Sequence, residues 1–257
     1  MSVGPRPSIG HSVILCEGFD DRSFWAGWLT HLGCVDPTDG GRNRDVRDVN
    51  DEKVVGKGRF LFATPTGSSL VIQPINGRSN LSRSLRDELK EHRTKPRRRI
   101  LLNLDSDADS FETSADRGLE SIIGIARDHG VTVGDPRTDY FEIDTVAVAA
   151  VIWECLDGVT PGVPAQQTLE RLVCASIQAA YPGRGSGVDD WLGAEPPPTT
   201  AVGPKHVGYS YLAKWYADFG ADDFYRAVWR DPATAEQLKL RLQQTGAWGI
   251  VERLVQG

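Results

Sequence analysis

Apolar residues recur along the first part of the chain in two patterns, short continuous runs and runs at four-residue spacing. Short apolar runs predict buried strands, and four-residue spacing predicts amphipathic helices. The apolar run within 11–18 is followed by Phe24, Trp28 and Leu32 at four-residue spacing, and Gly33 then supplies a helix stop. The first segment is therefore expected to form a strand, a turn and a helix.

The same alternation continues to about residue 145, after a polar loop expected at 34–58. The further elements expected are a hairpin or two strands at 59–77, a helix at 79–93 capped by Ser79 or Asn80, a strand within 97–110, a helix at 114–130 and one or two strands at 131–144. The apolar run at 100–104 fits a central parallel strand covered on both faces. Because successive parallel strands need helical crossovers, the pattern predicts an α/β fold with a mainly parallel, Rossmann-like sheet flanked by helices.

The second part of the chain has mostly helical periodicity. Segments of this kind begin with TVAVAAVIWECL at 145–156 and continue to the end, separated by stretches rich in Pro and Gly. The expected organisation is an α/β domain at 9–145 and a C-terminal, mostly helical lobe at 146–257. Four aromatic residues on one segment of this lobe are expected to be core rather than a base-stacking surface: Tyr211, Trp215, Tyr216 and Phe219.

Composition places the chain among globular proteins with reduced cysteines. Its 257 residues carry 29 Lys and Arg against 35 Asp and Glu, a formal charge of -6, so any binding of phosphate needs a local basic patch. The four cysteines lack zinc-ligand spacing and are expected to be reduced core residues. No apolar segment is long enough for a membrane span, and the N-terminus lacks the apolar stretch of a signal peptide, so a cytoplasmic location is expected.

Acidic residues follow two of the predicted strands. Glu17 closes the first strand and Asp21 follows it by one turn, while Asp105, Asp107 and Asp109 alternate after the strand near 100. Ligand sites of parallel α/β sheets lie beyond the carboxyl ends of the strands, at a topological switch point. Strand-like alternation would aim Asp105 and Asp107 at the same side. If the two strands are neighbours, four carboxylates converge: Glu17, Asp21, Asp105 and Asp107.

A convergent set of carboxylates favours a bound cation, because like charges at short distance raise each other's pKa unless a cation is recruited. Ligand sets made only of oxygens suit Mg²⁺ or Mn²⁺ better than zinc, and Mg²⁺ commonly binds one or two carboxylates together with substrate phosphate. The chemistry indicated is phosphoryl transfer.

Helix capping is the alternative role for some of these acids. Asp20 or Asp21 would serve as an N-cap of the first helix, and Asp109 or Ser110 as the cap of a later one. Capping does not account for Glu17, Asp105 or Asp107 at the end of a strand. A calcium-binding EF-hand is excluded, because the glycine and the final glutamate of that loop are missing from their positions.

The two acidic segments, EGFDD at 17–21 and LNLDSDAD at 102–109, resemble the motifs of the TOPRIM domain, the catalytic fold of topoisomerases, DnaG-type primases and OLD-family nucleases. The resemblance extends over most of the chain to small stand-alone TOPRIM-like proteins of bacteria and archaea. It is carried there by three further segments: INGRSNLSRSL at 75–85, QTLERL at 167–172 and KHVGYSYLAKW at 205–215.

The resemblance implies roles for individual residues. Asp105 and Asp107 match the DxD pair that holds Mg²⁺, and Glu17 matches the TOPRIM glutamate, which acts as general acid/base or as a further ligand. Asp21 matches a supporting acidic position. Lys205 matches a lysine that OLD-type nucleases tend to carry. Phe19 and Asp20 depart from the family, where these two positions are often polar or basic.

Two residues outside the acidic segments are further candidates. Arg78, beside a predicted helix N-terminus, is a candidate phosphate ligand, because exposed N–H groups and a guanidinium would act together. Glu170 is either another acidic residue of the site or a solvated helix residue.

Missing motifs narrow the expected function. The chain has no phosphate-binding loop of the GxxxxGK[ST] type, lacks a primase zinc segment and is too short for topoisomerase gates. The expectation is a Mg²⁺-dependent nuclease or related phosphodiester hydrolase acting on nucleic acid, DNA in preference to RNA. The alternative is a non-catalytic or regulatory subunit that binds metal or nucleotide in a defence or DNA-repair assembly. The sequence does not decide whether the chain acts with a partner protein such as an ATPase, or whether it forms an oligomer.

Overall fold

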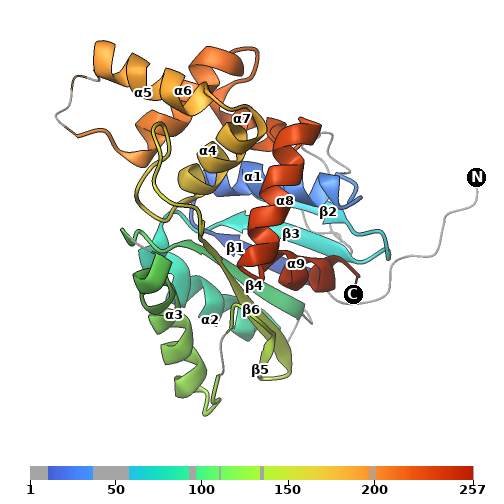
Figure 1. Ribbon diagram of the computed structural model, residues 1–257. Helices are drawn as coiled ribbons and strands as arrows, with labels where there is room; N and C mark the ends of the chain where they lie inside the picture. The colour runs from blue at the N-terminus through green and yellow to red at the C-terminus, as the bar shows by residue number, and fades with distance from the viewer. Residues whose placement is uncertain are drawn as a thin grey trace, which may run out of the picture.

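The computed structural model describes residues 11–36, 58–92, 97–109, 111–133, 136–196, 198 and 201–256; for 111–118, 121 and 221–222 it describes the backbone alone. Most of the loop expected at 34–58 lies outside the described residues. Figure 1 shows a central sheet between two helical layers. The α/β fold predicted from the alternation of strands and helices is confirmed.

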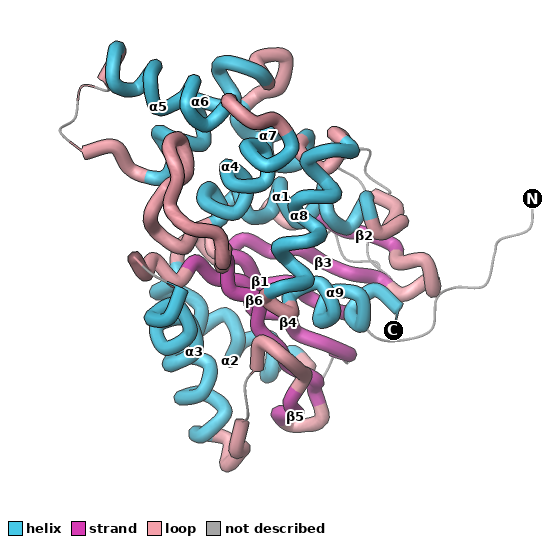
Figure 2. The backbone as a smooth tube through the Cα atoms, viewed as in Figure 1, coloured by secondary structure: helices cyan, strands magenta, loops and turns pink. Residues whose placement is uncertain are grey.

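The described strands form one six-stranded sheet in the order β2-β3-β1-β4-β6-β5. Its four central strands are parallel, and the two edge strands run antiparallel to their neighbours. The strands, magenta in Figure 2, are β1 (His11–Cys16), β2 (Phe60–Ala63), β3 (Ser69–Pro74), β4 (Arg97–Asp105), β5 (Phe141–Ile143) and β6 (Val146–Trp153).

Strand β1 alternates its side chains between two hydrophobic cores, as the two-residue period of a strand requires. Val13 and Leu15 belong to the core beneath α2 (Leu81–Glu91) and α3 (Phe111–Asp128). Ile14 and Cys16 belong to the core on the opposite face. Because both faces are covered, the strand is apolar throughout.

The opposite face of the sheet is covered by α1 (Phe19–His31) and by helices from the C-terminal half of the chain (Figure 1). Helix α1 ends at His31 and is followed at Gly33 by a φ of +84°, which suits glycine. It packs closely on the segment around Arg226: a Cβ on Gly27 would lie 2.8 Å from the Arg226 carbonyl oxygen. The C-terminal helices are α4 (Leu169–Ala180), α5 (Arg184–Ala194), α6 (Pro204–Trp215), α7 (Ala221–Ala227), α8 (Pro232–Gln244) and α9 (Ala247–Gln256).

The helical interpretation of 145–156 is wrong. Residues 146–153 form β6, which pairs in parallel with β4 inside the sheet. A short apolar run that is buried on both faces lacks the two-residue alternation by which a half-buried strand is recognised, so periodicity alone cannot separate it from a buried helix. The predicted boundary at 145/146 therefore cuts through the sheet. The helices after β6 also share one hydrophobic core with α1 and the sheet.

The expected cap of the helix at 79–93 is confirmed in its position, because Asn80 is the N-cap residue of α2. Residues Arg78–Asn80 form a short 3₁₀ turn that leads into α2, and no side-chain cap is formed there. The Asn80 amide instead donates to the carbonyls of Ile75 and Asn76. Asn80 therefore closes the turn that precedes the helix.

Other expectations from composition are confirmed. The four cysteines are free thiols and all are buried. Tyr211 and Tyr216 are buried in the core, and Trp215 and Phe219 pack against it. Among the helices of the described part, none combines the length and apolarity that a bilayer span requires.

Candidate functional site

The crevice of the sheet lies between β1 and β4. These parallel neighbours are followed by helices on opposite faces, α1 after β1 and α3 after β4. The chain therefore leaves the two carboxyl ends in opposite directions, which is the switch point where α/β sheets bind ligands. Glu17 directly follows β1 and Asp105 ends β4.

Glu17 and Asp105 are brought into contact, as the acidic segments predict. The Asp105 backbone N–H donates to Glu17 Oε1 at 3.1 Å. Asp105 Oδ1 in turn accepts a hydrogen bond from the Leu169 backbone N–H at 2.9 Å. Leu169 is the first residue of α4, so the positive end of that helix dipole faces the Asp105 carboxylate.

Asp21 lies deeper in the same crevice and is only 6% exposed. Its Oδ2 accepts from the Gly18 backbone N–H at 2.8 Å, which ties the first turn of α1 together. Its Oδ1 accepts from the Trp153 indole N–H at 2.6 Å. Both carboxylate oxygens of Asp21 therefore already accept a hydrogen bond. We assign Asp21 a supporting role, through its charge and position, in preference to the role of a metal ligand.

Glu170 completes the group, and its alternative role as a solvated helix residue is wrong. It is 5% exposed at the second position of α4, and the Tyr225 hydroxyl donates to its Oε1 at 3.3 Å. We call Glu17, Asp21, Asp105 and Glu170 the acidic cluster. It joins strand ends, the start of α1 and the start of α4.

The acidic cluster shifts the pKa values of its own members. Burial raises the pKa of Glu17 to about 7, with the Asp21 carboxylate adding to the effect. Burial likewise raises the pKa of Asp21 to about 6, against the hydrogen bonds from Trp153 and Gly18. The pKa of Asp105 is raised well above its usual range by burial and by the charges of Asp21, Glu170 and Glu17. Shifts of this kind in a crevice are typical of functional sites.

Asp107 and Asp109 lie outside the acidic cluster. The strand-like alternation expected for Asp105 and Asp107 is wrong, because β4 ends at Asp105 and Asp107 has a φ of +55°. The Asp107 side chain is 58% exposed and faces Arg78, with an Nη1 to Oδ2 distance of 3.9 Å. Asp109 is exposed, and within the described residues no contact joins it to Glu17 or Asp105. Asp107 and Arg78 thus form one rim of the crevice.

A second rim carries Asp20, Lys205 and Tyr209. The capping role for Asp20 is wrong, because Gly18 occupies the N-cap position of α1. Lys205 Nζ lies 3.1 Å from Asp20 Oδ2, and the Tyr209 hydroxyl donates to the same oxygen at 3.4 Å. Lys205 is therefore next to the site, as its segment predicts.

Some contributors have no clear signal in the sequence. Trp153 can be placed beside Asp21 only once β6 is known to be a strand. Tyr225 and the Leu169 N–H depend on how the helices pack, and nothing in the sequence pattern indicates them. Tyr209 has a weak signal, since it follows Lys205 by four residues on one helix face.

The donor atoms fit a hard divalent cation in their chemistry. Within the described residues, no three Asp, Glu, His or Cys side chains are placed to ligate one ion together. Magnesium needs only one or two carboxylates from a protein when water and substrate phosphate complete its octahedron. The hydrogen bonds described above use one carboxylate oxygen of each residue, Oε1 of Glu17 and Oδ1 of Asp105.

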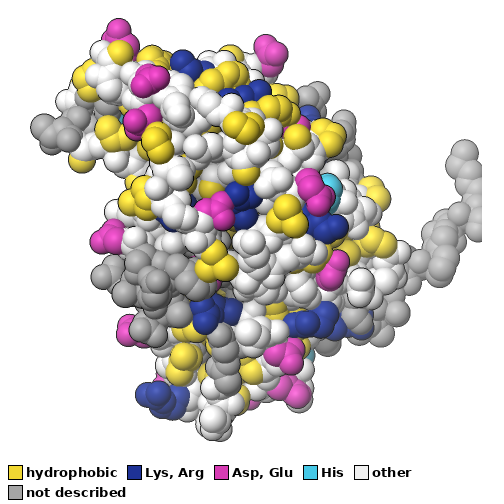
Figure 3. All heavy atoms as spheres, in the orientation of Figure 1, with side chains coloured by type: hydrophobic (Ala, Val, Ile, Leu, Met, Phe, Trp, Pro, Cys, Tyr) yellow, Lys and Arg dark blue, Asp and Glu magenta, His cyan; other side chains and the backbone are white. Residues whose placement is uncertain are grey.

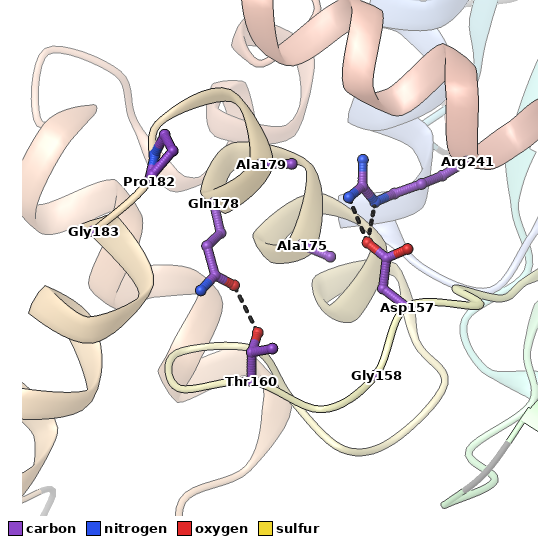
Figure 4. Close-up of a pocket in the computed structure, with 9 residues that line it drawn as sticks. All are labelled: Asp157, Gly158, Thr160, Ala175, Gln178, Ala179, Pro182, Gly183 and Arg241. Atoms are coloured by element: carbon purple, nitrogen blue, oxygen red, sulfur yellow. Dashed lines mark hydrogen bonds and ion pairs between the residues drawn. The ribbon is translucent and has the colours of Figure 1, made fainter.

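Two cavities in the C-terminal half lie away from the acidic cluster. One, of 490 Å³, is shown in Figure 4, and another, of 690 Å³, is lined by parts of 159–165 and by α5 and α6 residues. In the first, Arg241 binds Asp157, and the Thr160 hydroxyl donates to Gln178 at 2.7 Å. Because these polar groups bind one another, the cavity offers a ligand few directed contacts.

Comparisons with known proteins show the fold alone. No protein-family model matches the chain, and no curated protein matches it. Among solved structures it is similar to the crystal structure of hypothetical protein PH0156 from Pyrococcus horikoshii OT3, with a TM-score of 0.65 at 16% identity. The match covers 96% of this chain and 100% of that chain, so the two share one architecture from end to end.

Proposed function

We propose that this chain is a TOPRIM-type, Mg²⁺-dependent nuclease or related phosphodiester hydrolase. The observation that carries the proposal is the contact between Glu17 and Asp105 at the switch point of a parallel sheet, backed by Asp21 and Glu170. The acidic segments that resemble TOPRIM motifs contribute three of these four residues. Their meeting in one crevice is what a shared site requires.

Asp105 and Glu17 are the residues that would hold Mg²⁺ or Mn²⁺, and Asp107 lies at the rim beside them. The ion would supply phosphate polarisation and a more acidic bound water. Asp21 and Glu170 keep the crevice negative. The Leu169 N–H holds one oxygen of the Asp105 carboxylate in place.

Glu17 is suited to proton transfer at neutral pH. With a pKa of about 7, both its protonated and its ionised forms are populated there, which is the condition for an efficient general acid/base. Arg78 and Lys205 stand on opposite rims, where each can contact a phosphate oxygen of a bound strand.

The rival function is a binding or regulatory subunit, in which the same site holds metal or nucleotide without turnover. The surface supports this rival: acidic and basic side chains are interspersed on the face shown in Figure 3, and the net charge is -6. Nucleic-acid binding draws most of its affinity from Lys and Arg contacts with phosphate. For either function we place the protein in the cytoplasm, consistent with its free thiols.

The test of the proposal is a cleavage assay on the purified chain. Labelled single- and double-stranded DNA and RNA are incubated with Mg²⁺, with Mn²⁺ and with EDTA. We expect metal-dependent cleavage of DNA that EDTA abolishes. Intact substrates under every metal condition, including with a co-purifying partner present, would favour the binding subunit.

A further inference from the structure

Two aromatic side chains of this protein stand out by their exposure. Phe19 is 49% exposed and Tyr209 is 36% exposed, more than any other Phe, Tyr or Trp side chain that the structure describes. The remaining aromatic side chains described are buried or half-buried. An exposed aromatic ring offers a ligand a large, rigid contact surface.

Phe19 lies at the first position of α1, two residues after Glu17. The Arg22 guanidinium sits 4.8 Å from the centre of its ring and 4.2 Å from that of Phe60. This cation–π contact fixes one face of the Phe19 ring and leaves much of the side chain to solvent. The ring is thus held in place beside the acidic cluster.

Tyr209 reaches the same turn of α1 from α6. Its hydroxyl donates to Asp20, the neighbour of Phe19, at 3.4 Å, and Lys205 binds the same carboxylate. The side chain is therefore anchored at its tip, while its ring stays accessible. Two elements far apart in sequence thus each carry one exposed ring, since Phe19 precedes Asp20 on α1 and Tyr209 of α6 binds Asp20.

We infer that Phe19 and Tyr209 form an aromatic platform on which unpaired nucleobases stack, and that the site takes single-stranded nucleic acid. Stacking on aromatic rings is a sequence-tolerant way to bind single strands, because every base has a π face. In a duplex those faces are covered by neighbouring base pairs. The inference rests on the proposed function, because it names the class of substrate that the same site would bind.

The charge of the protein favours stacking over phosphate contacts. The net charge of -6 gives phosphate contacts little support from the protein as a whole, even with Arg22, Arg78 and Lys205 beside the described site. Stacking supplies affinity that does not depend on positive charge.

The test measures binding without turnover, in EDTA, by fluorescence anisotropy. The probes are labelled single-stranded DNA and RNA oligonucleotides of about 15 nucleotides, close to the upper site size of compact single-strand binders, and a DNA duplex of the same length. Phe19→Leu and Tyr209→Leu remove the ring but keep most of the volume. Phe19→Tyr and Tyr209→Phe keep the ring, and Leu240→Ala removes an exposed apolar side chain on α8.

We expect single strands of DNA, RNA or both to bind more tightly than the duplex. Each Leu variant should weaken single-strand binding by about fivefold or more, the lower end of what one stacked base contributes. Phe19→Tyr and Leu240→Ala should stay within about twofold of the parent, and Tyr209→Phe, which keeps the ring but loses the hydroxyl bond to Asp20, should weaken binding less than Tyr209→Leu. Circular dichroism would verify that each variant is folded.

Equal or tighter binding of the duplex, Leu variants that bind like the parent, or no binding of any oligonucleotide would overturn the platform. The last result would assign the rings to a protein partner. Cleavage by the parent that the Leu variants retain undiminished would reject the platform and leave the nuclease intact. Ring-dependent binding without cleavage under any metal would support the platform and reject the nuclease.

Discussion

Glu17→Gln is expected to lower the rate of phosphodiester cleavage at pH 7 by about 10² to 10⁴, the usual contribution of a general acid/base. Glutamine retains the oxygen that accepts from the Asp105 N–H, so the fold and the neighbouring ligand should be preserved. What it removes is a carboxyl whose pKa of about 7 lets it exchange a proton at neutral pH. The measurement is the single-turnover cleavage rate as a function of pH.

The matched control for this variant is Glu142→Gln, the same substitution at an exposed position of edge strand β5. It should cleave at the parental rate. The pH dependence near 7 should be present in the parent and the control and absent from Glu17→Gln. If Glu17→Gln also loses metal binding entirely, Glu17 is a ligand of the ion and another group moves the proton.

The metal-free protein is expected to lose stability as the pH rises from 5 to 8. Folding raises the pKa of Glu17 from 4.5 to about 7 and that of Asp21 from 3.8 to about 6. Carboxyls with raised values favour the folded state below their unfolded pKa, and this contribution is lost as pH rises through the folded pKa. Allowing for the partial exposure of Glu17, the loss is on the order of 3 kcal/mol.

Urea unfolding in EDTA at pH 5 and pH 8 measures this loss directly. Asp105→Asn should reduce it, because the substitution removes one of the charges that face one another in the crevice. Excess Mg²⁺ should restore stability at pH 8, by about 3 kcal/mol at a hundred times its dissociation constant. A free energy of unfolding that stays constant or increases from pH 5 to pH 8 would show that repulsion among the carboxylates of the acidic cluster does not destabilise the metal-free protein.

Much of the sheet could be predicted from the sequence because its strands and helices have distinct local patterns. The run before Glu17 and the run before Asp105 are short, apolar and followed by helical spacing, so both strands and their crossovers follow from periodicity. Strand β6 could not, because it is buried on both faces and carries no alternation. Its place between β4 and β5 is decided by tertiary pairing.

The meeting of Glu17 with Asp105 could be anticipated because both lie at carboxyl ends of strands that share a sheet. The position of the Asp107 side chain outside the acidic cluster could not be anticipated. Alternation predicts which side a side chain points to only while the strand continues, and β4 ends two residues before Asp107. The support given to Asp21 by Trp153 and to Glu170 by Tyr225 depends on packing between distant segments, for which the sequence has no local signal.

The most direct test of the central claim is Mn²⁺ binding, measured by calorimetry at pH 8 on the parent and on Asp105→Asn. The asparagine keeps the oxygen that accepts from the Leu169 N–H, so a change in affinity reports the lost charge and ligand oxygen rather than a collapsed crevice. We predict that the parent binds Mn²⁺, that Mg²⁺ displaces it, and that Asp105→Asn weakens binding by at least about tenfold. Equal affinity in the two proteins, or no binding by the parent, would contradict the assignment of the acidic cluster as a metal site.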